Sequence, residues 1–115
     1  MKENIILEKA LSFSVRMLKL AEFLQDKKQH IIANQILRSG TSIGANISES
    51  NYACSKPDFI NKLKIAEKEA SETLYWLKVL NKSEIIDAKQ FDSLFTDVDE
   101  LHRLIAASLK TLKSQ

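Results

Sequence analysis

Cys54, His30 and His102 are the residues of this 115-residue chain whose side chains best suit covalent or metal chemistry. A nucleophilic thiol needs a base within reach, and Cys54 lies near a predicted helix end with no histidine beside it. A ferritin-like metal site needs Glu-x-x-His pairs on two helices, whereas Asp99-x-x-His102 is a single imperfect match. We therefore expect a protein that is not an enzyme and that uses no metal or cofactor.

A stripe of polar side chains runs along one side of the segment from about residue 31 to residue 53. Its members, which fall within about 80° of one another on a helix, are Arg38, Ser42, Asn46 and Glu49. Serine and asparagine are poor helix formers, so they need a local reason to be there. Arg38 and Glu49 are too far apart to pair within one helix, so we expect each to contact a neighbouring helix or another subunit. Direct ligand binding is the alternative interpretation.

Basic side chains recur at helical spacing in two other segments. The first group is Lys9, Arg16 and Lys19, and the second is Lys64, Lys68 and Lys78, which share a helix face with Tyr75. The formal net charge is only +2, so the distribution of charge has to support any nucleic-acid role. Repeated around an oligomer, such stripes could together hold a phosphate backbone. The alternative is an ordinary solvated helix face.

Four amphipathic segments carry these residues. Apolar side chains at i, i+3/i+4 and i+7 spacing define one buried face in each segment. The four faces are Ile6, Ala10, Phe13, Met17, Leu20 and Leu24; Ile32, Ile36, Ile43 and Ile47; Phe59, Leu63, Ala66, Ala70, Leu74 and Leu77; and Phe91, Leu94, Val98, Leu101, Ile105 and Leu112. With two glycines and one proline, the chain has little turn chemistry for a strand-rich fold.

The connections between the segments are predicted near residues 27–30, 53–56 and 82–87. Ser55-Lys56-Pro57-Asp58, and Asp87 with Gln90, are typical capping sequences that indicate where the third and fourth helices begin. Connections this short make consecutive helices antiparallel neighbours. We therefore predict an all-α, antiparallel, up-down-up-down four-helix bundle in which residues 1–115 form one domain.

Gly40 and Gly44 both lie inside the second segment. Gly40-Thr-Ser-Ile-Gly44 lacks the following Lys-Ser/Thr of a phosphate-binding loop and does not follow a strand. Each glycine costs a helix about 1 kcal/mol relative to alanine, so a compensating benefit is expected. We expect that benefit to be close packing against a neighbouring helix.

The first and third helices have more apolar surface than one buried stripe requires. The extra residues are Leu7, Leu11, Val15 and Leu18 in the first helix, and Ile65, Trp76 and Val79 in the third. Large exposed apolar patches usually mark interaction surfaces, so we predict a homo-oligomer. The alternative is a bundle splayed enough for these flanks to reach the core.

The cellular compartment is indicated by what the sequence lacks. Cys54 is the single cysteine and cannot form an internal disulfide, which is typical of the reducing cytoplasm. Glu8 and Lys9 interrupt the first segment too early for the apolar region of a signal peptide. No run approaches the ~18 apolar residues that a membrane span requires. We expect a cytoplasmic protein with no membrane partner.

Two stretches resemble the sequences of a known family. They are Gln35-Ile-Leu-Arg38-Ser-Gly-Thr-Ser42-Ile-Gly-Ala-Asn46-Ile-Ser-Glu49 and Lys64-Ile-Ala66-Glu-Lys-Glu69-Ala-Ser-Glu72-Thr-Leu-Tyr75-Trp76-Leu77. Over nearly its whole length, the chain resembles the four-helix-bundle proteins encoded in intervening sequences of 23S ribosomal RNA genes. Within these two stretches, the candidate packing or interface residues are the polar stripe of the second segment and, in the third segment, Glu69, Glu72 and Trp76.

The same family includes the accessory variability determinant of diversity-generating retroelements. The resemblance implies a barrel-like homopentamer whose basic surface binds nucleic acid and a reverse transcriptase. Our leading hypothesis is a non-enzymatic oligomer that binds RNA or DNA through its basic faces, as an accessory to a nucleic-acid enzyme. The alternative is a protein-only scaffold in which the polar stripe and the flank around Trp76 contact other subunits or partners.

Overall fold

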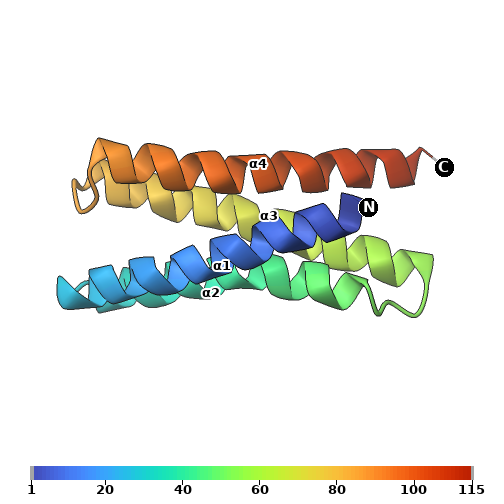
Figure 1. Ribbon diagram of the computed structural model, residues 1–115, viewed down its shortest axis with the longest axis horizontal. Helices are drawn as coiled ribbons and strands as arrows, with labels where there is room; N and C mark the ends of the chain where they lie inside the picture. The colour runs from blue at the N-terminus through green and yellow to red at the C-terminus, as the bar shows by residue number, and fades with distance from the viewer. Residues whose placement is uncertain (1, 115) are drawn as a thin grey trace.

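Over residues 2–114, which the computed structural model describes, the chain folds into four α-helices and contains no strand. The helices are α1 (Lys2–Asp26), α2 (His30–Ser50), α3 (Lys56–Lys82) and α4 (Ala88–Lys113). Side chains are described from residue 5 to residue 114. All four helices run along the long axis of a molecule measuring 46 × 21 × 19 Å (Figure 1). The predicted all-α fold is confirmed.

Each helix packs against two others, so that the helices follow one another around the bundle in chain order. Short connections at residues 27–29, 51–55 and 83–87 reverse the chain each time, and both termini lie at the same end (Figure 1). This arrangement is the predicted up-down-up-down antiparallel bundle. Because α1 and α3 are diagonal partners that do not pack on each other, their outward faces lie on opposite sides of the molecule.

The predicted buried faces come together in one core. All six predicted residues of α1 are buried, and Phe13, Met17 and Leu24 are at most 1% exposed. Leu77 of α3 and Ile105 of α4 are also fully buried in the same core. The predicted core residues that are only half-buried, yet pack against this core, are Ile32, Phe59, Leu74, Phe91 and Leu112. Each fully buried side chain of this size contributes about 1.5–3 kcal/mol, so these stripes determine the fold.

α1 and α2 pack closely because both glycines of α2 face α1. A Cβ atom added to Gly40 would lie 2.5 Å from Met17 Cγ and 2.6 Å from its Sδ, which is far inside van der Waals contact. A Cβ atom added to Gly44 would lie 3.3 Å from Ser14 Oγ. The expectation of close helix packing is therefore confirmed, and Gly40 is the tighter of the two positions.

The caps of α3 and α4 are formed as the sequence indicates. Ser55 Oγ accepts a hydrogen bond from the backbone N–H of Asp58 at 3.2 Å. Asp87 Oδ1 accepts from the N–H of Gln90 at 2.7 Å, while Gln90 Oε1 accepts from the N–H of Asp87 at 2.9 Å. These bonds satisfy backbone donors that the first helical turn leaves unpaired.

The end of α2 differs from the prediction, because the helix ends at Ser50 and not near residue 53. Residues 51–55 form the connection, and Ser55 at its end adopts an extended conformation, with φ −159° and ψ 166°, that caps α3. The hydroxyl of Ser50 donates to the carbonyl of Ile47 at 2.6 Å, within the last turn of α2.

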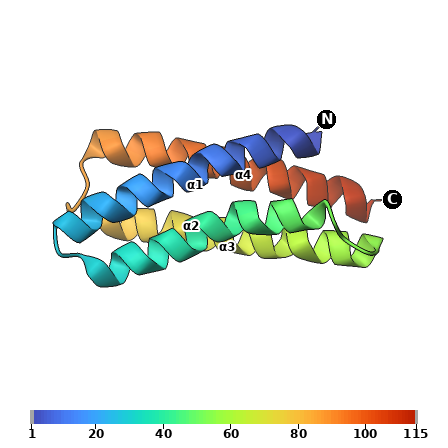
Figure 2. The same ribbon diagram turned by 60° about the horizontal axis from the view of Figure 1, so that its bottom comes forward.

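The fourth side of the bundle is looser than the other three. α1 packs less closely on α4 than on α2, and it runs obliquely across α4 (Figure 2). Long charged side chains bridge the two helices there.

None of the helices that the structure describes combines the length and the apolar character of a membrane span.

Candidate functional site

The polar stripe of α2 faces α3, and its two charged residues each find a partner there. Arg38 Nη2 lies 3.0 Å from Glu72 Oε2, and Glu49 Oε1 lies 3.2 Å from Lys62 Nζ. Arg38 also donates to Gln35 Oε1 of its own helix at 3.3 Å. Arg38 and Glu49 thus each contact the neighbouring helix α3 within one chain.

The uncharged residues of the stripe bond to their own helix instead. Ser42 Oγ donates to the carbonyl of Arg38 at 2.7 Å, and Asn46 Nδ2 donates to the carbonyl of Ser42 at 2.9 Å. Both residues are half-buried. Such bonds to the preceding turn are a common way for polar side chains to remain inside a helix.

A buried pair of hydroxyl groups sets the register of α2 against α3. Thr73 Oγ1 lies 2.9 Å from Ser39 Oγ and donates to the carbonyl of Glu69 at 2.8 Å. Both hydroxyl residues are fully buried. This pair was not predicted from the sequence, although Ser39 falls on the buried isoleucine face of its helix and Thr73 lies one turn before Leu77.

One carboxylate in this seam has an oxygen without a partner. Glu69 is half-buried, and its Oε2 atom is buried with no hydrogen-bond partner in the described part of the chain. The pairings of Ser39 with Thr73 and of Glu49 with Lys62 place Glu69 level with Ser42 across the seam. Glu69 thus lies at the α2–α3 contact.

Trp76 of α3 is fixed by the same ion pair. Its indole Nε1–H donates to Glu72 Oε2 at 3.1 Å, so this oxygen accepts from both Trp76 and Arg38. The ring is half-buried and packs against the core. Tyr75 meets it edge to face, with ring centroids 5.2 Å apart and an angle of 67° between the planes. The Tyr75 side chain itself points outward and is 59% exposed.

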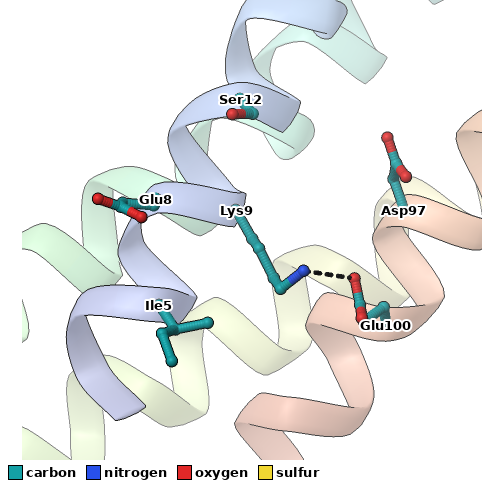
Figure 3. Close-up of a pocket in the computed structure, with 6 residues that line it drawn as sticks. All are labelled: Ile5, Glu8, Lys9, Ser12, Asp97 and Glu100. Atoms are coloured by element: carbon teal, nitrogen blue, oxygen red, sulfur yellow. Dashed lines mark ion pairs between the residues drawn. The ribbon is translucent and has the colours of Figure 1, made fainter. Parts of the chain in front are cut away.

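The basic group of α1 is largely neutralised by α4. Lys9 Nζ lies 3.2 Å from Glu100 Oε1, and Arg16 forms an ion pair with Asp97. Arg16 also donates to Ser93 Oγ at 2.9 Å. Figure 3 shows Lys9 reaching from α1 to Glu100 beside an open groove. The remaining residues that line this groove are Ile5, Glu8, Ser12 and Asp97. Of the α1 group, only Lys19 has no acidic partner among the described side chains.

The basic group of α3 is different, because all of its members are exposed. Lys64, Lys68 and Lys78 lie on the outward side of the helix with Tyr75 and, in the last turn, Lys82. No carboxylate among the described side chains lies within ion-pairing distance of these lysines. The two basic groups are on diagonal helices, so they form separate surfaces and not one site.

The extra apolar residues divide into two sets. Trp76 and Leu7 pack against the core, as the splayed-bundle interpretation expects, and Ile65 and Val79 are half-buried. In contrast, the exposed fractions on α1 are 64% for Leu11, 47% for Val15 and 58% for Leu18. We call these three residues the α1 apolar face. Beside them lies a shallow groove lined by Leu7, Leu11, Ser14, Gly44, Ala45 and Ser48.

The residues considered for catalysis make other contacts. His102 Nε2 lies 3.1 Å from Ser71 Oγ in the α3–α4 seam, and Asp99 pairs with Arg103 at 3.0 Å. Cys54 is exposed, and its Sγ lies 3.7 Å from Asp58 Oδ2. Within the described residues, no cluster of three or more His, Cys, Asp or Glu side chains could hold a metal ion.

The fold and the contacts between its helices are those of an antiparallel four-helix bundle. Sequence comparison identifies the family within this class. The family model of the 23S rRNA-intervening sequence proteins matches residues 2–107, so the chain belongs to that family. A crystal structure of a protein of unknown function, from the S23 ribosomal protein family of Bacteroides thetaiotaomicron, is 48% identical in sequence. That similarity covers 96% of this chain and 99% of the other, with a TM-score of 0.93. No curated protein matches the chain.

Proposed function

We propose that this protein is a non-enzymatic homo-oligomer that binds RNA or DNA through the outer face of α3. The observation that supports nucleic-acid binding is the set of exposed lysines Lys64, Lys68 and Lys78, which have no acidic partner among the described side chains. Affinity for nucleic acid comes mainly from cations that neutralise phosphates and release their counterions. Lysines in this state are available for that role.

The α1 group is less suited to the same role. Lys9 and Arg16 would have to leave Glu100 and Asp97 before they could contact a phosphate, and the freed carboxylates would repel it. Lys19 is exposed and can add to the field around the molecule. The α3 face is therefore the primary surface in this proposal.

Self-association is supported by the α1 apolar face. Exposed, contiguous apolar side chains on a helix are typical of interaction surfaces. Because α1 lies diagonally across from α3, an oligomer that buries Leu11, Val15 and Leu18 leaves the α3 lysines of every copy facing outward. Their fields then add, which compensates for the small net charge of one chain.

The number of copies and the wider role rest on the family resemblance. The likeness to the accessory variability determinant supports a homopentamer and an accessory role beside a reverse transcriptase or another nucleic-acid enzyme. The gene's neighbourhood is informative here, since a ribosomal RNA operon and an adjacent reverse transcriptase gene imply different partners.

The test of nucleic-acid binding is fluorescence anisotropy with a labelled, structured RNA across a salt series. The observed association constant should fall linearly with log salt concentration, since each phosphate contact releases counterions. If the RNA is not bound at low ionic strength, the proposal is wrong.

A protein-only scaffold is the second candidate, because the α1 apolar face requires no nucleic acid to explain it. Under this alternative, the protein self-associates or binds a partner through Leu11, Val15 and Leu18, and the α3 lysines serve solubility. The two candidates differ in one outcome. If the protein binds nucleic acid through α3, reversing the charge of Lys64 and Lys68 abolishes its function. If the protein is a protein-only scaffold, the same change leaves its function unchanged.

A further inference from the structure

Tyr75 lies in the middle of the line of lysines on α3. Lys68 comes seven residues before it and Lys82 seven residues after it, and Lys78 is one turn away. Side chains seven residues apart share a helix face, and a rise of 1.5 Å per residue puts them about 10 Å apart along the axis. An exposed aromatic ring is thus flanked by cations on both sides.

Tyr75 contacts Trp76, which a chain of polar contacts connects to α2. The rings of Trp76 and Tyr75 meet edge to face, with their centroids 5.2 Å apart, and the indole Nε1–H of Trp76 donates to Glu72. Arg38 of α2 in turn holds Glu72 at 3.0 Å. A ring restrained in this way loses less conformational freedom when it binds a flat ligand, because part of the ordering has already occurred.

We propose that Tyr75 is a stacking platform for an unpaired base, so that the α3 face prefers single-stranded to double-stranded nucleic acid. The inference rests on the nucleic-acid binding proposed above and names the form of nucleic acid that binds. Sequence-tolerant single-strand sites combine cations along the backbone with aromatic rings on which bases stack. In a duplex, each base is already stacked and paired, so it cannot cover the ring.

The same chemistry predicts little sequence preference. The side chains around Tyr75 on this face are mainly lysines, which contact phosphates, and every base has a π-face that can stack. Stacking also needs no 2′-hydroxyl group. Unpaired segments of RNA and of DNA are therefore expected to bind with similar affinity.

Trp76 provides the measurement, because it is the only tryptophan in the chain and contacts Tyr75 directly. Its emission is titrated with a single strand of about 15 nucleotides, and separately with the blunt duplex that this strand forms with its complement. The variants are Tyr75→Ala and Tyr75→Phe. The matched control is Tyr52→Ala, which removes another exposed tyrosine, in the connection between α2 and α3.

The expected result has three parts. The single strand changes the Trp76 emission and binds more tightly than the duplex. Tyr75→Ala weakens single-strand binding by about fivefold or more while duplex binding is unchanged. Tyr75→Phe, which keeps the ring, and Tyr52→Ala both retain the affinity of the unmodified protein.

Two contrary outcomes can be told apart. Binding of both nucleic acids with no effect of Tyr75→Ala overturns the stacking platform and leaves the proposed function intact. Binding of neither nucleic acid by the unmodified protein overturns the proposed function and the platform together.

Arg38 and Glu72 act in this inference as positioning residues. Glu72→Ala removes the acceptor of the indole N–H, whereas Glu72→Gln keeps a carbonyl oxygen there. Glu72→Ala is expected to shift the Trp76 emission and to reduce the preference for single strands. Glu72→Gln is expected to keep the emission and the preference of the unmodified protein. If Glu72→Ala leaves the emission and the preference unchanged, the positioning role is wrong.

Discussion

Arg38 of α2 and Glu72 of α3 form an ion pair in which one carboxylate oxygen also accepts the indole N–H of Trp76. The pair joins the two stretches of sequence that carry the family resemblance. It ties the polar stripe of α2 to the aromatic residues of α3. The charged residues of the stripe therefore contact α3, and the stripe is connected to the proposed binding surface through Trp76 and Tyr75.

The two members of this pair should differ in their contribution to stability. Arg38 is largely exposed, so Arg38→Ala is expected to cost at most about 1 kcal/mol. Glu72→Ala also leaves the half-buried indole N–H of Trp76 without its acceptor, so it should cost about 1–3 kcal/mol. Urea denaturation of both variants measures the difference. A larger loss for Arg38→Ala than for Glu72→Ala would show that Trp76 does not depend on this carboxylate.

Substitutions at the two glycines of α2 should also differ. Gly40→Ala puts a methyl group 2.5 Å from the fully buried Met17, so it is expected to destabilise the fold by about 1–3 kcal/mol. Gly44→Ala is the matched control. Its closest contact is 3.3 Å, and its gain of about 1 kcal/mol in helix propensity offsets the crowding. Thermal unfolding of both variants is the measurement, and equal melting temperatures would contradict the packing at Gly40.

Asn46→Ala should leave stability nearly unchanged. Within the described part of the chain, the amide of Asn46 bonds only to the carbonyl of Ser42 in its own helix, and alanine is the better helix former by a few tenths of a kcal/mol. The free energy of unfolding, measured by thermal denaturation, is expected to change by less than about 0.5 kcal/mol. A loss of several kcal/mol, or a change in oligomer mass, would mean that Asn46 contacts another subunit.

Self-association should depend on the α1 apolar face. Leu11→Lys combined with Leu18→Lys keeps two good helix formers while it places charges on the exposed surface, so the helix should persist and the oligomer should dissociate. Light scattering at micromolar concentration reports the mass. Tyr52→Lys, at another exposed position, should leave that mass unchanged. An unmodified protein that is monomeric under these conditions would contradict the oligomer.

The helices and their order are predictable from the sequence because they follow from local spacing. The stripe containing Phe13 and Met17, and the cap at Asp87, require no knowledge of distant residues. The proposed binding surface is less predictable. Lys9 and Lys64 have similar surroundings in the sequence, yet among the described side chains only Lys9 has an acid, Glu100, opposite it. That pairing depends on how α1 crosses α4, which local spacing does not encode.

The burial of Trp76 was likewise not predictable from local spacing. In the sequence, Trp76 resembles an exposed apolar residue beside the buried face, as Leu11 does. In the folded chain, the indole has a partner in Glu72 and packs against the core, while Leu11 has no such neighbour and stays exposed. Which flank reaches the core depends on the shape of the whole bundle.

The most direct test of the α3 surface is the salt dependence of RNA binding by two double variants of equal charge. Lys64→Ala with Lys68→Ala removes two exposed lysines from α3, and Lys89→Ala with Lys110→Ala removes two exposed lysines from α4. We predict that the α3 variant weakens binding and lowers the slope of log affinity against log salt by roughly 1.5. The α4 variant should bind like the unmodified protein, and identical slopes for the two variants would contradict binding through the outer face of α3.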